Sequence, residues 1–178
     1  MEHLELIKAC KQNSYQAQIK VYESYKDMMF NACWRILRNE HDAQDAVHDA
    51  FIKAFKNIHK LDYDTNLGAW LKRIVINHSL DLLKAKKKIK WLEDTEVADG
   101  ETDEKDDDAD RQWSVERVKK AIDGLKEKYR IIVVLYLIEN YTHKEIAQAL
   151  NLNESTVRNQ YKRGKEQLQQ QLKNTILS

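Results

Sequence analysis

The chain has 178 residues, no proline and only four glycines, with 30 basic against 29 acidic side chains. So few turn-forming residues exclude most all-β folds, which need them at every hairpin. The closest glycines, Gly100 and Gly124, are 24 residues apart, so the clustered glycines of a nucleotide-binding phosphate loop are absent too. The longest apolar run, 131–138, is too short to cross a bilayer. We therefore expect a cytoplasmic helical protein with no membrane insertion.

The charges are distributed unevenly along the chain. Residues 1–92 hold 16 basic and 11 acidic side chains, residues 93–110 hold 1 and 11, and residues 111–178 hold 13 and 7. A strip with so much like charge gains nothing from burial, whereas each flank is long enough for a small core. The sequence thus predicts two domains, 1–92 and 112–178, joined by an acidic flexible linker, 93–111.

The first domain shows helical periodicity in four segments. We predict helices over about 3–11, 14–38, 42–58 and 68–90. Loop 61–67 separates the last two, because its polar residues favour turns and helix caps. The apolar side chains of the 14–38 segment fall on one face: Ile19, Tyr22, Met29, Cys33 and Ile36.

The second domain also reads as helical throughout. Val115, Val118 and Ile122 mark a helix that Gly124 closes, and an almost wholly apolar helix follows over about 128–138. Thr142 and Glu145 have the spacing of a capping box, which starts a short helix. After a turn at 151–153, a last helix runs over 154–172. A short helix, a tight turn and a longer helix make a helix-turn-helix, so the predicted fold class is all-α.

The outward face of the last helix is cationic and rich in amides. Helical spacing turns Val157, Tyr161, Gly164 and Leu168 inward. Lysine, arginine and asparagine on the opposite face suit phosphates and base edges, which favours DNA binding over a solvated face of mixed charge. The outward residues are Arg158, Asn159, Lys162, Arg163 and Lys165.

The 68–90 helix carries a second such face. An aromatic ring, an amide and several cations follow one another at steps of three and four, as on a surface that binds unstacked bases. Two plainer interpretations remain open, a tryptophan in the domain core and a solvated lysine-rich helix end. The residues are Trp70, Arg73, Asn77, Asp81, Lys84 and Lys88.

Four segments together resemble the extracytoplasmic-function sigma factors of bacterial RNA polymerase, which contain two helical domains called regions 2 and 4. They are 45–51 (DAVHDAF), 69–77 (AWLKRIVIN), 142–147 (THKEIA) and 156–158 (TVR). The resemblance extends over nearly the whole chain. It implies that the chain recruits core RNA polymerase to promoters and helps to open them.

The resemblance also assigns roles to individual residues. Core polymerase would be bound through Asp45, His48, Asp49 and Phe51, although His48 replaces the family's usual glutamine. The single-stranded minus-10 element would be held by Asp62, Tyr63, Asp64, Thr65, Asn66, Trp70, Arg73, Asn77, Lys84 and Lys88. The double-stranded minus-35 element would be read by Thr156, Arg158, Asn159, Lys162 and Arg163.

Such a protein is not an enzyme, and we expect no cofactor and no metal. The resemblance implies an anti-sigma factor as an inhibitory partner. The linker is either a simple tether or, as the resemblance implies, a nucleic-acid mimic that would lie in the basic channels of the polymerase.

Two other functions remain open. A helix-turn-helix regulator that binds DNA without polymerase would explain residues 112–178, but would leave 45–51 and 69–77 without a role. A metalloenzyme would need Asp45 and His48 on one helix to face His78 and Asp81 on another, together with further carboxylates.

Overall fold

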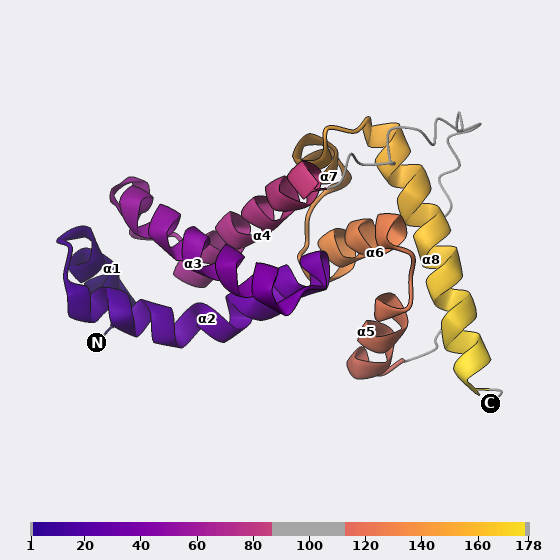
Figure 1. Ribbon diagram of the computed structural model, residues 1–178, viewed down its shortest axis with the longest axis horizontal. Coiled ribbons are helices and arrows are strands. Elements are labelled where there is room, and N and C mark those ends of the chain that lie inside the picture. The colour runs from indigo at the N-terminus through magenta and orange to yellow at the C-terminus, as the bar shows by residue number, and fades with distance from the viewer. Residues whose placement is uncertain (1, 87–112, 177–178) are drawn as a thin grey trace. The chain divides into compact units, whose positions relative to one another are not determined.

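The computed structural model describes residues 2–86 and 113–176, and the predicted linker lies outside these ranges. The chain divides into two compact units, Met1–Lys88 and Ile89–Ser178. All regular elements of the described residues are helical (Figure 1), which confirms the predicted all-α class.

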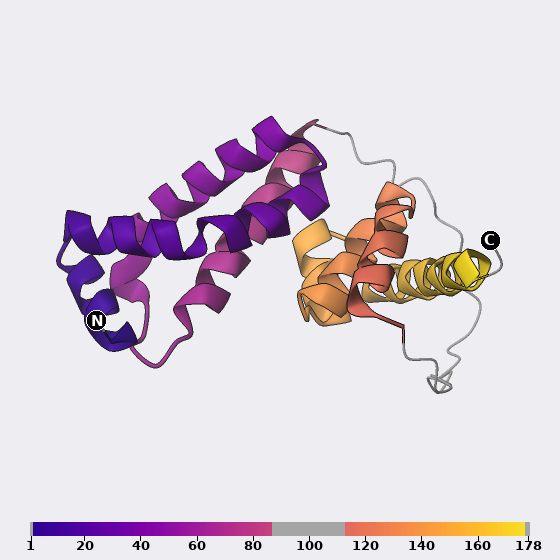
Figure 2. The ribbon, with the colours of Figure 1, turned by 90° about the horizontal axis from the view of Figure 1, so that it is seen from below.

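The N-terminal unit is a bundle of α-helices. Helices α2, α3 and α4 pack against one another, while α1 packs against α2 and the short 3₁₀-helix η1 (Figure 2). The elements are α1 (His3–Lys11), α2 (Tyr15–Leu37), α3 (Glu40–Asn57), η1 (Ile58–Lys60) and α4 (Leu67–Lys86).

Short polar side chains start these helices. Ser14 Oγ accepts a hydrogen bond from the Ala17 amide, and Asn39 Oδ1 accepts one from the Asp42 amide at 2.9 Å. Because Asn39 is a cap, α3 begins at Glu40, two residues before the predicted start. Arg38 ends α2 in the left-handed conformation, with φ 54°.

The core of this unit consists mainly of aliphatic side chains. Met29, Ile36, Leu67 and Ile76 are fully buried. One predicted core position is wrong: Ile19 is 42% exposed, because the buried face of α2 runs through Ala17 and Val21 instead.

The C-terminal unit is built on one long helix, which the other helices cover on one side. Helix α8 contacts α5, α6 and α7, and the core between them includes Ile122, Val133, Leu168 and Leu172. Its elements are α5 (Val115–Asp123), α6 (Glu127–Val133), the π-helix η3 (Val134–Ile138), α7 (His143–Leu150) and α8 (Glu154–Ile176).

Two details of this unit differ from the prediction. Val115 is 69% exposed, so it does not belong to the buried face of α5. The segment predicted as one helix over 128–138 changes at Val134 from an α-helix to a π-helix. A π-helical turn shifts the phase of the following residues, and Leu137 at 44% exposure lies outside the core.

Gly164 allows α6 and α8 to approach closely. A Cβ atom at Gly164 would meet Val133 Cγ2 at 2.9 Å and Tyr129 Cβ at 3.2 Å. These atoms belong to buried side chains that cannot move without repacking the core.

We predict that Gly164→Ala lowers the free energy of unfolding of the C-terminal unit by about 1–2 kcal/mol, since overpacking outweighs the better helix propensity of alanine. Denaturant unfolding followed by circular dichroism measures the change. Gly124→Ala is the matched control, because its Cβ would meet the flexible end of Gln171 at 3.1 Å and the Ala121 carbonyl oxygen at an ordinary contact distance of 3.5 Å. Equal stability of the two variants would contradict this packing argument.

Candidate polymerase and DNA interfaces

Helix α3 presents a mixed acidic and apolar surface to solvent. Its inner face buries alanines, Val47 and Phe51 against α2 and α4. The outer face exposes Asp45, His48, Asp49 and Ile52, which follow one another at helical spacing. We call these four residues the α3 face. Its apolar member, Ile52, is 55% exposed.

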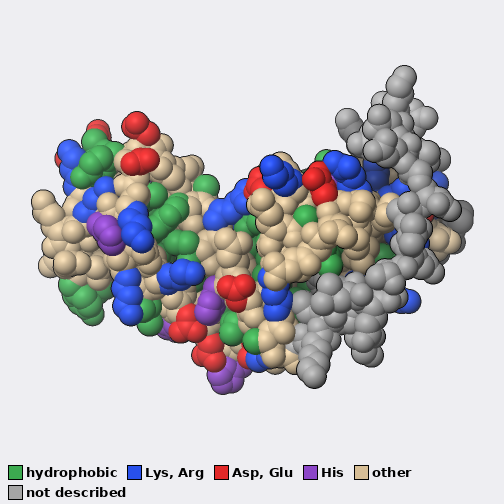
Figure 3. Space-filling model, turned by 90° about the horizontal axis from the view of Figure 1, so that it is seen from above, with side chains coloured by type: hydrophobic (Ala, Val, Ile, Leu, Met, Phe, Trp, Pro, Cys, Tyr) green, Lys and Arg blue, Asp and Glu red, His purple; other side chains and the backbone are tan. Residues whose placement is uncertain are grey.

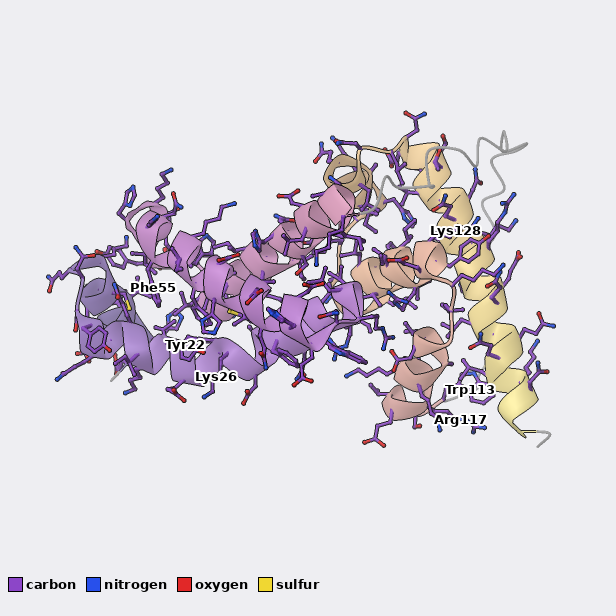
Figure 4. The ribbon with its side chains drawn as sticks, in the orientation of Figure 1. Tyr22, Lys26, Phe55, Trp113, Arg117 and Lys128 are labelled. Carbon is purple, nitrogen blue, oxygen red and sulfur yellow. The ribbon has the colours of Figure 1, made fainter. Side chains whose placement is uncertain are left out.

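Phe51, expected to bind the polymerase, lies inside the bundle. It is 3% exposed, and its ring centroid is 4.9 Å from that of Tyr22 and 5.9 Å from that of Phe55. Figure 4 labels Tyr22 on α2 and Phe55 on α3. A direct contact of Phe51 with the polymerase stays a prediction. One residue of helix turns a side chain by about 100°, so its neighbour Ile52 is the apolar side chain that α3 exposes.

Histidines of the same chain already accompany the carboxylates of α3. His41 Nδ1 lies 3.1 Å from Asp45 Oδ2, and His78 Nε2 lies 3.3 Å from Asp49 Oδ2. Red acidic and purple histidine side chains lie side by side on one edge of the N-terminal unit in Figure 3. A hydrogen bond with its own backbone, and then the charge of Asp45, raise the pKa of His41.

These pairs leave the acidic character of the α3 face intact. The side chains of His41 and Asp45 are 83% and 62% exposed, and such pairs contribute little to stability in water. A basic partner that excludes water can therefore replace them at small cost.

The loop before α4 is anchored at both ends by buried leucines. Leu61 is 4% exposed and Leu67 is fully buried, whereas Asp62, Tyr63, Asp64 and Asn66 between them are exposed and Thr65 is half-buried. The Thr65 amide donates to the Asp62 carbonyl at 3.1 Å. Asn66 Oδ1 accepts from the Ala69 amide at 3.0 Å and so caps α4.

Helix α4 separates its polar and apolar faces clearly. Leu71, Val75, Ile76 and Leu80 are buried. On the opposite side Arg73, Asn77 and Asp81 are exposed, while Trp70 and Lys84 are half-buried; Lys88 lies outside the described residues. Trp70 is thus neither wholly in the core nor wholly free. We call the polar and aromatic residues on this side the stripe on α4. The stripe follows directly after the loop along the chain.

Helices α7 and α8 form the predicted helix-turn-helix. Thr142 Oγ1 accepts from the Glu145 amide at 3.1 Å, and Asn151 in the turn has φ 54°. On α8, Arg158, Lys162 and Arg163 are exposed, whereas Thr156 and Asn159 are half-buried. Val157 and Leu168 are buried, as predicted. The predicted DNA-reading residues therefore lie on one accessible face.

A cluster of three rings supports this helix-turn-helix, and no sequence pattern predicted it. The His143 ring stacks on Tyr136 at 4.4 Å between centroids, and Tyr161 lies 5.3 Å from His143. The rings come from η3, α7 and α8, so they join the three elements that position the recognition helix. Burial, and then the nearby charge of Arg158, lower the pKa of His143.

Comparison with known proteins identifies the family. Sigma-70 region 2 matches residues 21–89, and sigma-70 region 4 matches residues 116–168. The chain is 33% identical to the ECF RNA polymerase sigma factor SigW of Bacillus subtilis (strain 168), over 94% of this chain and 95% of that protein. The chain is an extracytoplasmic-function RNA polymerase sigma factor. As such, it directs RNA polymerase to promoters and is not an enzyme.

Two solved structures share the fold of this sigma factor. CnrH, in complex with the cytosolic domain of CnrY, has a TM-score of 0.54 and 22% identity, over 96% of this chain and 97% of that one. RpoE of Bartonella quintana, in complex with the anti-sigma factor NepR, has a TM-score of 0.52 and 18% identity, over 86% and 95%.

The family match favours the sigma factor over the two other functions considered. It covers 45–51 and 69–77, which a lone helix-turn-helix regulator would leave without a role. Among the described residues, His78 contacts Asp49, and no group of three or more His, Cys, Asp or Glu side chains has a metal-binding arrangement. Within the same residues, no helix is long and apolar enough to cross a membrane.

The ring cluster predicts that acid destabilises the C-terminal unit. The folded unit favours the neutral His143 ring, so the unfolded chain binds the proton more tightly. The stability contribution is therefore complete above the ordinary histidine pKa of about 6.5 and is lost as the pH falls through the lowered pKa. As the pH falls below about 6.5, hydrogen exchange of the α7 and α8 amides should become faster, after correction for the pH dependence of the intrinsic exchange rates. His143→Phe keeps a stacked ring that cannot titrate. An unchanged pH dependence in that variant would refute the assignment to His143.

Proposed function

We propose that this sigma factor uses three separate surfaces in one initiation event. The α3 face docks on core polymerase, the loop 62–66 with the stripe on α4 captures the minus-10 element as a single strand, and α8 reads the minus-35 element as a duplex. The observation that carries the proposal is the exposure of all three surfaces on helices whose opposite faces are buried. In this proposal, residues 1–92 and 112–178 form the two domains, and the acidic linker joins them.

The α3 face suits a basic partner with an apolar centre. Asp45 and Asp49 offer carboxylate oxygens to arginine and lysine, which steers docking and fixes its register. Ile52 supplies an exposed apolar side chain between polar neighbours, as in the centre of a protein interface. Phe51 has a positioning role in this scheme, because its packing on Tyr22 fixes the rotation of α3.

In this proposal, the free energy that opens the promoter comes from binding of the single strand and not from a chemical reaction of the sigma factor. Extracting a base from the stack costs a few kcal/mol, and pocket contacts must offset that cost. The exposed amide of Asn77 hydrogen-bonds to base edges, and the rings of Trp70 and Tyr63 offer stacking surfaces. Arg73 and Lys84 supply positive charge along the same stripe, and we place Lys88 at its continuation.

Duplex reading belongs to the outer face of α8. Each bidentate contact from arginine or asparagine to a base contributes about 1–3 kcal/mol of discrimination. Arg158 is held by Glu154 at 2.6 Å, and both side chains are accessible. Because this ion pair is exposed and weak, DNA can take the place of Glu154 at small cost.

We further propose that the protein acts in the cytoplasm and is held inactive by an anti-sigma factor. The described residues contain no membrane-spanning helix, and both fold relatives were solved in complexes, one with the anti-sigma factor NepR. Such an inhibitor would compete with polymerase or DNA for the surfaces above.

Ile52→Ser should weaken binding to core polymerase about tenfold, equivalent to about 1.4 kcal/mol, while leaving the fold intact. The side chain is already exposed, so its loss removes little packing. Titration of labelled protein with core polymerase gives the dissociation constant. Val115→Ser is the matched control, because Val115 is 69% exposed on α5 of the C-terminal unit. Equal losses in both variants would place the docking surface elsewhere.

Asn77→Ala should abolish most open complexes while the variant still binds core polymerase. Permanganate reactivity of promoter thymines measures opening on a promoter first identified by run-off transcription of genomic fragments. Asn31→Ala makes the same change at an exposed position of α2 and should open the promoter normally. Normal opening by Asn77→Ala would show that the strand is captured without this amide.

A further inference from the structure

Helix α1 precedes the region matched by the family and carries no assigned role. The match to region 2 begins at residue 21, whereas α1 spans His3–Lys11. Helix α1 buries Leu6, Ile7 and Cys10 and packs against α2 and η1. It is therefore fixed to the bundle, and its polar side chains have defined positions.

The last residue of α1 contacts the loop implicated in strand capture. Lys11 Nζ donates a hydrogen bond to the Leu61 carbonyl at 2.5 Å. The same ammonium lies 4.0 Å from the centroid of the Tyr63 ring. Leu61 is the buried anchor of the loop, and Tyr63 is its exposed aromatic residue, at 45% exposure. The Lys11 side chain thus joins α1 both to Leu61, at the start of the loop, and to the Tyr63 ring within it.

Two physical effects follow from this contact. The ammonium attracts the negative face of the Tyr63 ring and limits its rotation, which lowers the entropy that binding would otherwise cost. It also adds a positive charge to a loop in which Asp62 and Asp64 carry negative charges that repel a DNA strand. Lys8 lies farther from the ring, at 5.9 Å.

We propose that Lys11 is a positioning residue for strand capture. It holds Tyr63 in the orientation in which an unstacked base of the non-template strand stacks on the exposed part of the ring. This inference rests on the proposed capture of a single strand by loop 62–66. It gives α1 a part in promoter opening and makes base preference depend on a residue 50 positions before Leu61, the anchor of the loop.

The test measures the affinity of the holoenzyme for a labelled single-stranded oligonucleotide. The oligonucleotide carries the non-template minus-10 sequence of a promoter that the holoenzyme transcribes, and each of its bases is varied in turn. Lys11→Met keeps the length and the apolar stem of the side chain but removes the charge and the donor. Lys8→Met makes the same change on the same helix without disturbing the bond to Leu61. Circular dichroism checks that each variant is folded.

We expect Lys11→Met to weaken oligonucleotide binding about tenfold and to reduce discrimination among bases at one position. Lys8→Met should change affinity less than about twofold, as expected for one exposed charge at physiological salt. Tyr63→Ala should reproduce the loss, and the double variant Lys11→Met/Tyr63→Ala should bind no more weakly than Tyr63→Ala, because both changes remove one function. Tyr63→Ala also leaves the bond from Lys11 to Leu61 available.

Two results would overturn the role of Lys11. Equal losses in Lys11→Met and Lys8→Met, with a shallower salt dependence and unchanged base preference, would mean that Lys11 only neutralises phosphate. Wild-type binding by Lys11→Met, with weaker binding by Tyr63→Ala, would leave strand capture intact and refute the positioning. Failure of the proposed function is a different result, in which neither Tyr63→Ala nor Asn77→Ala weakens strand binding.

Discussion

In the function that we propose, promoter opening depends on free energy of binding, because the sigma factor performs no chemical step. Base pairs and stacks resist opening, and each extracted base costs a few kcal/mol. A small helical domain meets that cost only if its recognition side chains are held rigidly before the strand arrives. The buried faces of α3, α4 and α8 provide this rigidity, since each fixes the rotation of a helix whose other face we propose to bind a partner.

The fold was predictable because its signals are local. Asn66 and Thr142 each cap a helix within three residues along the chain, and the structure contains both caps. Apolar periodicity located the long helices for the same reason. It failed at Ile19 and Val115, where an apolar side chain fits the helical period but the neighbouring helix packs against a different part of the turn.

The candidate site was predictable only where one helix contains it. The outward residues of α8 and the stripe on α4 follow from helical spacing alone. Phe51 and Ile52 are adjacent and both apolar, so only packing against Tyr22 decides which one is buried. The contacts of Lys11 with Leu61 and Tyr63, and of His41 and His78 with the α3 carboxylates, depend on a tertiary arrangement or a rotamer that a sequence pattern does not specify.

The central claim is that both units act together on core polymerase, and a footprint tests it most directly. Purified protein and core polymerase at micromolar concentration should form a one-to-one complex that protects two separate promoter segments, with reactive single-stranded bases only in the downstream one. The protein alone should open no bases. Failure to bind polymerase in the absence of any inhibitor, or protection of both segments without polymerase, would contradict the account.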